Sequence, residues 1–349
     1  MENLMNKMPF NNNKYIQIQK DAILSRIQNY ERLYIEVGGK IFDDYHASRV
    51  LPGFEPNVKI QILKELKNDL EIIFCINARH IIAKKLREDY GLTYDNELLR
   101  LIGCMRDIGI SVCGVVINFY EDHPLIEEFK ERCAGINVPT YRSYYMDCYP
   151  SDINKVVSQD GFGYNDHVKT SKKIVLVSAP GASSGKLEVC LSQLYHDKLN
   201  GIISGYAKYE TFPVWNLPTT HLVNVAYEMA TADLLDYNII DPFHKAATGK
   251  IAVNYNRDID AFPLVSKILK MIYGEDVYAS PTAMGINNVG FAIENDRAVQ
   301  KACMQEIERR WDKIKTAYKN FQLGTKTFER SLELVVQARE LYSKLEIEE

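Results

Sequence analysis

The stretch "KKIVLVSAPGASSGKLEVCLSQLYHD", residues 172–197, has the pattern of a buried strand, a glycine-containing turn and the first turns of a helix. Such a turn binds phosphate when its backbone N–H groups point into one concavity, small residues let a ligand approach and a lysine meets the anion. The segment 181–186, small residues ending in a lysine, has this composition. The P-loop pattern would also have glycine in place of Pro180 and a Mg²⁺-binding serine or threonine in place of Leu187. The sequence therefore predicts the anion-binding half of that signature without the metal-binding half.

Strands and helices alternate through the first half of the chain. Short apolar or β-branched runs predict strands at 33–37, 71–77, 111–118, 138–144 and 173–179. Helical periods predict helices between them at 58–68, 96–109 and 125–135. Repeated strand–helix–strand units imply right-handed crossovers. We therefore expect an α/β fold with a mostly parallel, doubly wound sheet flanked by helices.

The carboxyl ends of parallel strands form the edge where such sheets bind ligands. The predicted strand ends carry polar or glycine residues: Gly38, Gly39, Lys40, Asn77, Arg79, His80, Asn118, Tyr120 and the segment 181–186. If the sheet is parallel, these groups converge on one edge. The alternative is that the glycines serve tight turns and that Asn77 and Asn118 cap the following helices.

The segment 204–265 is dense in aromatic and amide residues, so we interpret it as lining a site. Within it, Asp241 follows an apolar run, where an NTPase keeps a carboxylate for Mg²⁺. An aspartate before proline also begins turns, which is the simpler interpretation. His221, Asn224 and Glu228 have helical spacing and would share one face, either solvated or ligand-binding.

The composition of the chain limits the classes of protein to which it can belong. The chain has 349 residues, 46% hydrophobic and 25% charged, with a net charge of -4 and no basic stripe, so nucleic acid is not an expected partner. The N-terminus lacks a signal-peptide pattern and no apolar run approaches the ~20 residues of a membrane span. Seven scattered cysteines without a CxxC pair fit reduced thiols. We expect a cytoplasmic protein.

The expected organisation is an α/β domain over 1–293, with a subdivision near 150–170 left open, followed by a helical segment over 294–349. The last helix ends with apolar residues that need a partner, either the body of the domain or a second subunit of a homo-oligomer. These residues are Phe328, Leu332, Val335, Leu341 and Leu345.

Several long motifs resemble a bacterial family known as DUF1846 or UPF0371. They are "YIEVGGKIFDDYHASRVLPGFEP", "APGASSGK", "GYAKYETFPVWNLP", "IIDPFH", "NYNRDIDAFP" and "SPTAMGINNVGF", and together they span nearly the whole chain. The family has no established biochemical function. Some members have been labelled ATP-dependent peptidases, but this chain has neither a GxSxG nor an HExxH motif.

The chain departs from the family in two places. The family's turn reads APGPGSGK, whereas this chain has Ala182 for the proline and Ser183 for the glycine. Ser183 should exclude any backbone geometry that only glycine reaches. The resemblance also implies a further C-terminal α/β domain, which we expect this chain, as a truncated or naturally short member, to lack.

The first function that we expect is an enzyme acting on a nucleotide or another small phosphorylated metabolite by phosphoryl or acyl-phosphate transfer. The binding residues would be Asn77, Asn118, Gly181, Ser183, Ser184, Gly185 and Lys186. Metal-binding, general-base and charge-stabilising roles would fall to Lys208, Glu210, Asp241, His244, Arg257 and Asp258. Among them Asp241 is the metal candidate, and the expected cofactor is ATP or another nucleotide with Mg²⁺.

Two other functions remain open. A non-catalytic binding or regulatory protein would keep the phosphate turn, and the leucine at 187 favours it because the Mg²⁺-binding hydroxyl is missing. A hydrolase with a cysteine or serine nucleophile is the third, although no histidine adjoins any cysteine.

Overall fold

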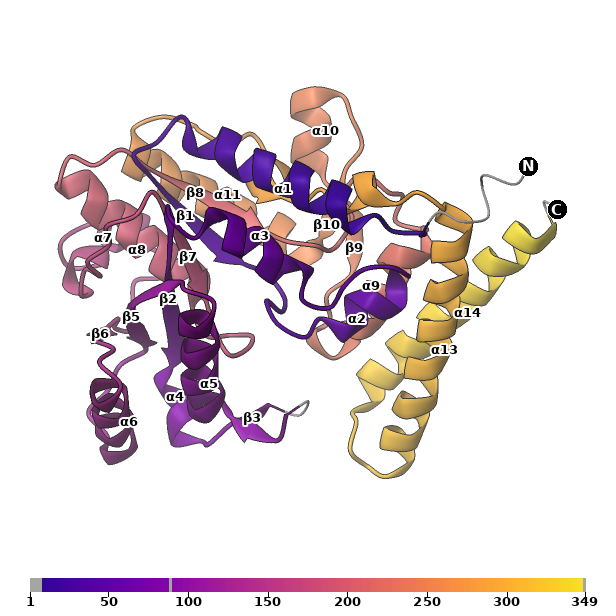
Figure 1. Ribbon diagram of the computed structural model, residues 1–349, viewed down its shortest axis with the longest axis horizontal. Helices are drawn as coiled ribbons and strands as arrows, with labels where there is room; N and C mark the ends of the chain where they lie inside the picture. Colours follow the sequence, from indigo (N-terminus) through magenta and orange to yellow (C-terminus); the bar gives the residue numbers. More distant parts are fainter. Residues whose placement is uncertain (1–7, 88–89, 348–349) are drawn as a thin grey trace.

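The computed structural model describes residues 8–87 and 90–347. A seven-stranded sheet runs through the molecule in the order β11-β8-β1-β7-β2-β5-β6, and every pairing in it is parallel (Figure 1). Its strands are β1 Arg32–Val37, β2 Leu70–Asn77, β5 Ser111–Asn118, β6 Thr140–Arg142, β7 Ile174–Ser178, β8 Ser204–Tyr209 and β11 Gly285–Ile286. The expected α/β fold is confirmed.

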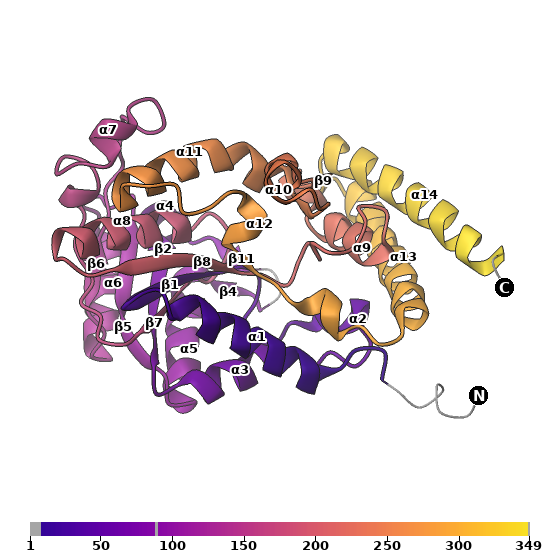
Figure 2. The same ribbon diagram turned by 90° about the horizontal axis from the view of Figure 1, so that it is seen from above.

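Helices cover both faces of the sheet (Figure 2). On one face lie α1 Asn12–Ile27, α3 Val58–Leu66, α5 Tyr94–Asp107 and α6 Pro124–Gly135, and on the other lie α8 Lys186–Leu199 and α11 Asn256–Tyr273. Along β7, Ile174 and Leu176 pack into the first core while Val175 and Val177 pack into the second. Burial on both faces explains why this strand is a continuous apolar run rather than an alternating one.

Shorter elements complete the chain. They are α2 Tyr45–Val50, α4 Ala78–Ile82, β3 Leu86–Arg87, β4 Leu92–Thr93, α7 Ile153–Val156, α9 Leu222–Ala230, β9 Asn238–Ile240, α10 Pro242–Thr248, β10 Val253–Tyr255 and α12 Pro281–Met284. Strands β3 and β4, like β9 and β10, form small antiparallel pairs. The five predicted strands are all present, with β6 shorter than its predicted range, 138–144.

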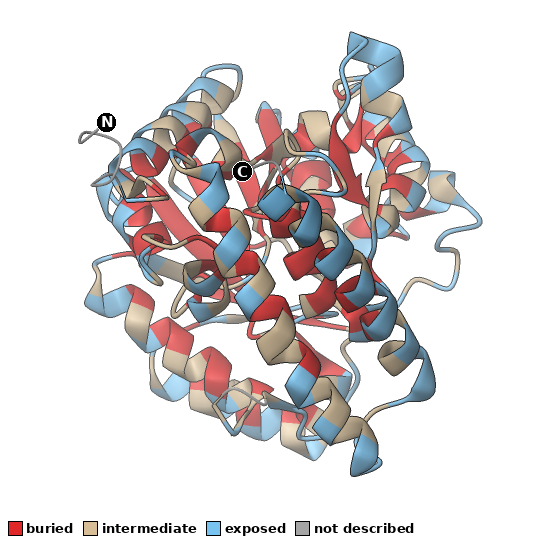
Figure 3. Ribbon diagram, turned by 90° about the vertical axis from the view of Figure 1, so that its right-hand side faces the viewer, coloured by how far each residue is buried: buried red, intermediate tan, exposed pale blue. Residues whose placement is uncertain are grey.

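The C-terminal part consists of two long helices, α13 Asp296–Lys319 and α14 Thr325–Ile347, as predicted. Helix α14 packs on α13 and α9, and its Val335 is fully buried. Figure 3 shows that the helices on this side of the molecule carry both buried and exposed residues. The ring of Phe328 lies 5.2 Å from that of Trp311, and Leu341 and Leu345 pack against the same core. Leu332 alone among the five predicted apolar positions stays 41% exposed. The body of the molecule therefore supplies the partner that this helix needed.

Across residues 8–87 and 90–347, the structure contains no helix with the length and apolar character needed to cross a membrane.

Candidate functional site

A cleft of about 1150 Å³ opens at the carboxyl edge of the sheet. The first long helix after β1, α3, packs on one face of the sheet, and the helix that follows β7, α8, packs on the other. Adjacent parallel strands whose connections leave on opposite faces form a topological switch point, the usual ligand crevice of such sheets. Gly38 and Gly39 after β1 and the turn after β7 both line the cleft at this point.

The turn of residues 181–185 joins the central strand β7 to helix α8, which begins at Lys186. Gly185 has φ +85°, and a Cβ atom there would lie 2.3 Å from Nδ2 of Asn118. A Cβ atom on Gly181 would lie 2.3 Å from the Tyr94 hydroxyl, so both glycines are required by close packing. Ser183 has φ +58°, a left-handed conformation that glycine adopts more readily but serine still reaches.

Side chains bind the carbonyl groups of the turn. Nδ2 of Asn118 donates to the Ser184 oxygen over 2.5 Å, and Nδ2 of Asn77 donates to the Ser183 oxygen over 3.4 Å. The Gly181 oxygen accepts from the Ser184 hydroxyl at 3.0 Å. Asn77 also caps α4 by accepting from the N–H of Arg79, as the simpler interpretation of its position predicted. Neither asparagine lines the cleft, so both support the turn from beneath.

The N–H groups of the turn contrast with its carbonyl groups. Within residues 8–87 and 90–347, none of the backbone N–H groups of residues 181–185 has a close and well-aligned hydrogen-bond acceptor. Lys186 lines the cleft, and its side chain forms no ion pair or hydrogen bond in the same described part of the chain. Successive N–H groups at the start of a helix, with a lysine beside them, form a concavity suited to an anion.

A charged cluster lines the cleft beside the turn. Nζ of Lys208 lies 2.6 Å from Oδ2 of Asp258 and 2.9 Å from Oε1 of Glu210. Burial lowers the pKa of Lys208, but the carboxylates of Asp258 and Glu210 outweigh it and hold that pKa above its usual range. Burial raises the pKa of Glu210 to about 7, and the neighbouring Asp258 adds to this rise while Lys208 opposes it. The raised pKa of Glu210 therefore lies near neutral pH.

Two more carboxylates border this cluster. Arg257 pairs with Asp236 at 3.0 Å and approaches Asp258 at 4.0 Å. Glu36 at the end of β1 lines the cleft and accepts a hydrogen bond of 2.7 Å from Tyr206. Sequence reasoning missed Glu36, although an acid within an apolar strand, just before a glycine pair, was a usable signal.

The predicted metal candidate, Asp241, lies away from the lining of the cleft and is fully buried. Its carboxylate caps α10 by accepting from the N–H of His244 at 2.9 Å, and it accepts from the Thr282 hydroxyl at 2.6 Å. His244 does line the cleft. Among the described residues no group of three or more His, Cys, Asp or Glu side chains is arranged to hold a metal ion.

Four other polar residues of the 204–265 segment have structural partners. Asn224 binds the backbone of Val214, and Glu228 accepts from the backbone N–H of Asn238 at 3.0 Å. Both are buried, while half-buried His221 caps α9 by accepting from the N–H of Val223, and none of the three lines the cleft. Asn256 accepts from the N–H of Tyr237 at 2.9 Å, and buried Asn254 binds its own strand.

All seven cysteines are free thiols, and four of them are buried. Burial raises the pKa of Cys75 and of Cys133 to about 12. A thiol is nucleophilic as its thiolate, so these two have the character of structural residues.

Comparison with known proteins identifies the family of this chain. A family described as "Domain of unknown function DUF1846, N-terminal" matches residues 8–339. A protein named UPF0371 from Streptococcus equi subsp. zooepidemicus is 50% identical over 333 residues, covering 95% of this chain and 66% of that protein. The UPF0371 protein of Streptococcus thermophilus is 50% identical over 317 residues, 90% of this chain and 64% of its own length. The chain thus spans less than two thirds of these relatives, and it belongs to the DUF1846 family.

Proposed function

We propose that the cleft binds a small phosphorylated ligand and that the turn of residues 181–185 holds its phosphate. One observation supports the proposal most directly. The backbone N–H groups of the turn lack hydrogen-bond partners among the described residues, whereas two of its carbonyl groups accept hydrogen bonds from Asn77 and Asn118. A helix N-terminus favours negative charge, and Lys186 adds a point charge at the same place. The cleft of about 1150 Å³ can hold a nucleotide or another metabolite of comparable size.

The neighbouring Lys208 cluster suits the protein to chemistry on that ligand. A general base works best when its pKa lies near the working pH, and the pKa of Glu210 is raised to about 7. Lys208, with Arg257 beside the cluster, can stabilise negative charge that develops during transfer of a phosphoryl or acyl-phosphate group. We therefore propose Glu210 as the base and Lys208 as the electrostatic group.

A binding protein without chemistry is the second candidate, and Leu187 favours it. Nucleotide-hydrolysing P-loops keep a serine or threonine at that place for Mg²⁺. Titration of ATP, GTP and inorganic phosphate with and without Mg²⁺, together with an assay for nucleotide turnover, separates the two candidates. Tight binding without turnover would favour the binding protein.

The Lys186→Ala variant tests the proposal shared by both candidates. Loss of a charge-assisted contact is expected to weaken phosphate binding by about tenfold to a hundredfold in isothermal titration. Lys267→Ala, at an exposed position of α11 outside the cleft, is the matched control. Thermal melts of both variants should stay close to the wild type, since Lys267 is exposed and half-buried Lys186 has no ion pair or hydrogen bond to lose within the described residues, so each change should lie within about 0.5 kcal/mol. Unchanged phosphate affinity in Lys186→Ala would refute the proposed site.

A further inference from the structure

Glu306 of helix α13 is a buried carboxylate surrounded by three arginines. Arg309 binds it with a two-pronged contact, Nε and Nη2 each 2.6 Å from a carboxylate oxygen. Nε of Arg49 lies 2.9 Å from Glu306 and Nε of Arg310 lies 3.1 Å from it. One carboxylate therefore faces three guanidinium groups, and Arg309 alone balances its charge.

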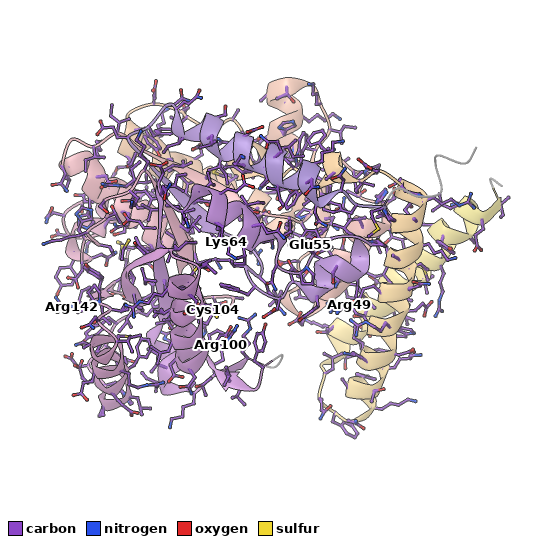
Figure 4. All side chains as sticks on the ribbon, viewed as in Figure 1. Arg49, Glu55, Lys64, Arg100, Cys104 and Arg142 are labelled. Carbon is purple, nitrogen blue, oxygen red and sulfur yellow. The ribbon has the colours of Figure 1, made fainter. Side chains whose placement is uncertain are left out.

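Arg49 and Arg310 hold this carboxylate through Nε only. Their terminal amino groups donate no hydrogen bond within residues 8–87 and 90–347. Both side chains line the cleft, whereas Arg309 does not. Figure 4 places Arg49 on α2, across the opening from Arg100 on α5. Arg100 differs, because Nε and Nη2 both bind Glu97, at 2.7 and 2.9 Å.

The floor of the cleft beside these arginines contains two more polar groups without a partner. Nδ1 of His46 contacts Glu306 at 3.1 Å, while its Nε2 atom and the Tyr227 hydroxyl are buried and form no hydrogen bond among the described residues. The two rings lie 4.4 Å apart and both residues line the cleft. Burial lowers the pKa of His46 to about 4, so the imidazole is neutral and adds no charge. Unsatisfied polar atoms in a packed interior are characteristic of functional sites.

We propose that Arg49 and Arg310 form a second anion subsite in the same cleft, so that the ligand carries two oxyanion groups. One group lies on the turn of residues 181–185 and the other between the two arginines. Paired guanidinium forks suit the geometry of a phosphate or a carboxylate. The two-anion ligand rests on the proposed function for its first group, whereas the arginine subsite rests on its own contacts.

Inorganic phosphate alone is the first probe, in equilibrium dialysis at constant ionic strength. The wild type is expected to bind two ions per chain, and the double variant Arg49→Gln/Arg310→Gln one. Arg339→Gln is the matched control, because this exposed arginine pairs with Glu308 outside the cleft and its loss should leave both ions bound. Thermal melts verify folding, and Arg49→Gln alone, at a side chain that is 40% exposed, provides a milder variant. If the folded double variant still binds two ions, the proposal of an arginine subsite is wrong.

Linear alkane bisphosphates of increasing length then test whether one ligand reaches both places. A chain that spans the cleft is expected to bind at least about tenfold more tightly than inorganic phosphate, because its second contact is intramolecular. That gain should disappear in Lys186→Ala and in the double arginine variant. A gain that survives in the double arginine variant would contradict the two-anion ligand. If succinate competes for the arginine subsite, the natural occupant is a carboxylate. If succinate fails to compete, the occupant is a phosphate.

The variants also separate this inference from the proposed function. If the arginine substitutions leave phosphate binding unchanged while Lys186→Ala weakens it, the proposed function stands and this inference fails. If Lys186→Ala has no effect while the arginine substitutions remove one ion, the turn is no phosphate site, and only the arginine subsite survives.

Discussion

The side-chain amide of Asn118 donates a hydrogen bond of 2.5 Å to the backbone oxygen of Ser184, across 66 residues of sequence. Asn118 is fully buried at the end of β5, so this contact fixes the turn to the sheet. The orientation of the unpartnered N–H groups therefore depends on a residue that no ligand touches.

Asn118→Ala is expected to reduce both stability and anion binding. The substitution leaves a carbonyl group without its buried donor, which typically costs about 1–3 kcal/mol. It also frees the turn to rotate, so phosphate affinity should fall although no contact to the ligand is removed. Urea unfolding and phosphate titration of the same preparation measure the two effects. Normal affinity in a destabilised variant would show that the turn keeps its shape without this bond.

Gly185→Ala and Gly201→Ala compare two glycines with similar backbone conformations. Gly185 has φ +85° with Asn118 in the way of a Cβ atom, while Gly201 has φ +73° and nothing within 4 Å. The left-handed conformation alone costs about 1 kcal/mol in each variant. We expect Gly185→Ala to lose at least twice as much stability and to bind phosphate weakly, and Gly201→Ala to bind it normally. Equal losses of stability in the two variants would mean that the Asn118 side chain changes position to make room for the added methyl group.

The apolar runs of the sequence were sufficient to predict the central strands, because strands buried on both faces are apolar throughout. Strand β8 was missed, since "SGYAKY" brings Lys208 into the sheet and interrupts such a run. Charged and aromatic residues are dense in the 204–265 segment, and many of them line the cleft. This density led to the correct prediction that the segment lines a site, but it also hid the patterns of strand β8 and helix α11.

The contacts of the cleft could not be derived from sequence. Lys208 and Asp258 were both candidates, but their 2.6 Å contact depends on how β8 and α11 pack. Arg49 and Glu306 lie 257 residues apart, and no local pattern pairs them. Asn77 and Asn118 were expected to bind a ligand or cap helices, whereas their bonds to the turn appear only once the strands are aligned.

Lys208→Met is expected to destabilise the protein most strongly at high pH. The side chain is only 18% exposed and separates two carboxylates, so its loss leaves uncompensated buried charge at a cost of about 3 kcal/mol. Protonation of Glu210 removes part of this repulsion, so the deficit should shrink as the pH falls below about 7. Guanidinium unfolding at about pH 5.5 and at about pH 8 measures this difference in the free energy of unfolding. A deficit independent of pH would contradict an electrostatic cause.

Arg330 and Arg339 provide a matched pair for the attachment of α14. Arg330 pairs with Glu228 of α9, which is only 7% exposed, whereas Arg339 pairs with Glu308 of α13, which is 37% exposed. Arg330→Ala leaves a buried carboxylate unpaired and should cost about 3 kcal/mol. Arg339→Ala should cost less than about 1 kcal/mol. Similar losses in thermal unfolding would show that α14 is held by its apolar contacts alone.

Glu188 gives the fold a dependence on pH. It lies in the first turn of α8, accepts a hydrogen bond of 2.6 Å from Ser143, and burial raises its pKa from 4.5 to about 7. An acid with a raised pKa in the folded state binds its proton more tightly when folded. Its stabilising contribution is therefore complete below pH 4.5 and is lost as the pH rises through about 7.

Glu188→Gln replaces this acid with a neutral side chain that still accepts from Ser143. We expect the variant to be more stable than the wild type above about pH 8, by on the order of 3 kcal/mol, and equally stable below about pH 4.5. It should also bind phosphate more tightly at high pH, because a negative charge two residues from Lys186 is removed. Glu329→Gln, at an exposed position of α14, is the control and should change neither quantity by more than about 0.5 kcal/mol. Parallel stability curves for wild type and Glu188→Gln between these pH values would mean that this carboxyl group stays hydrated in the folded protein.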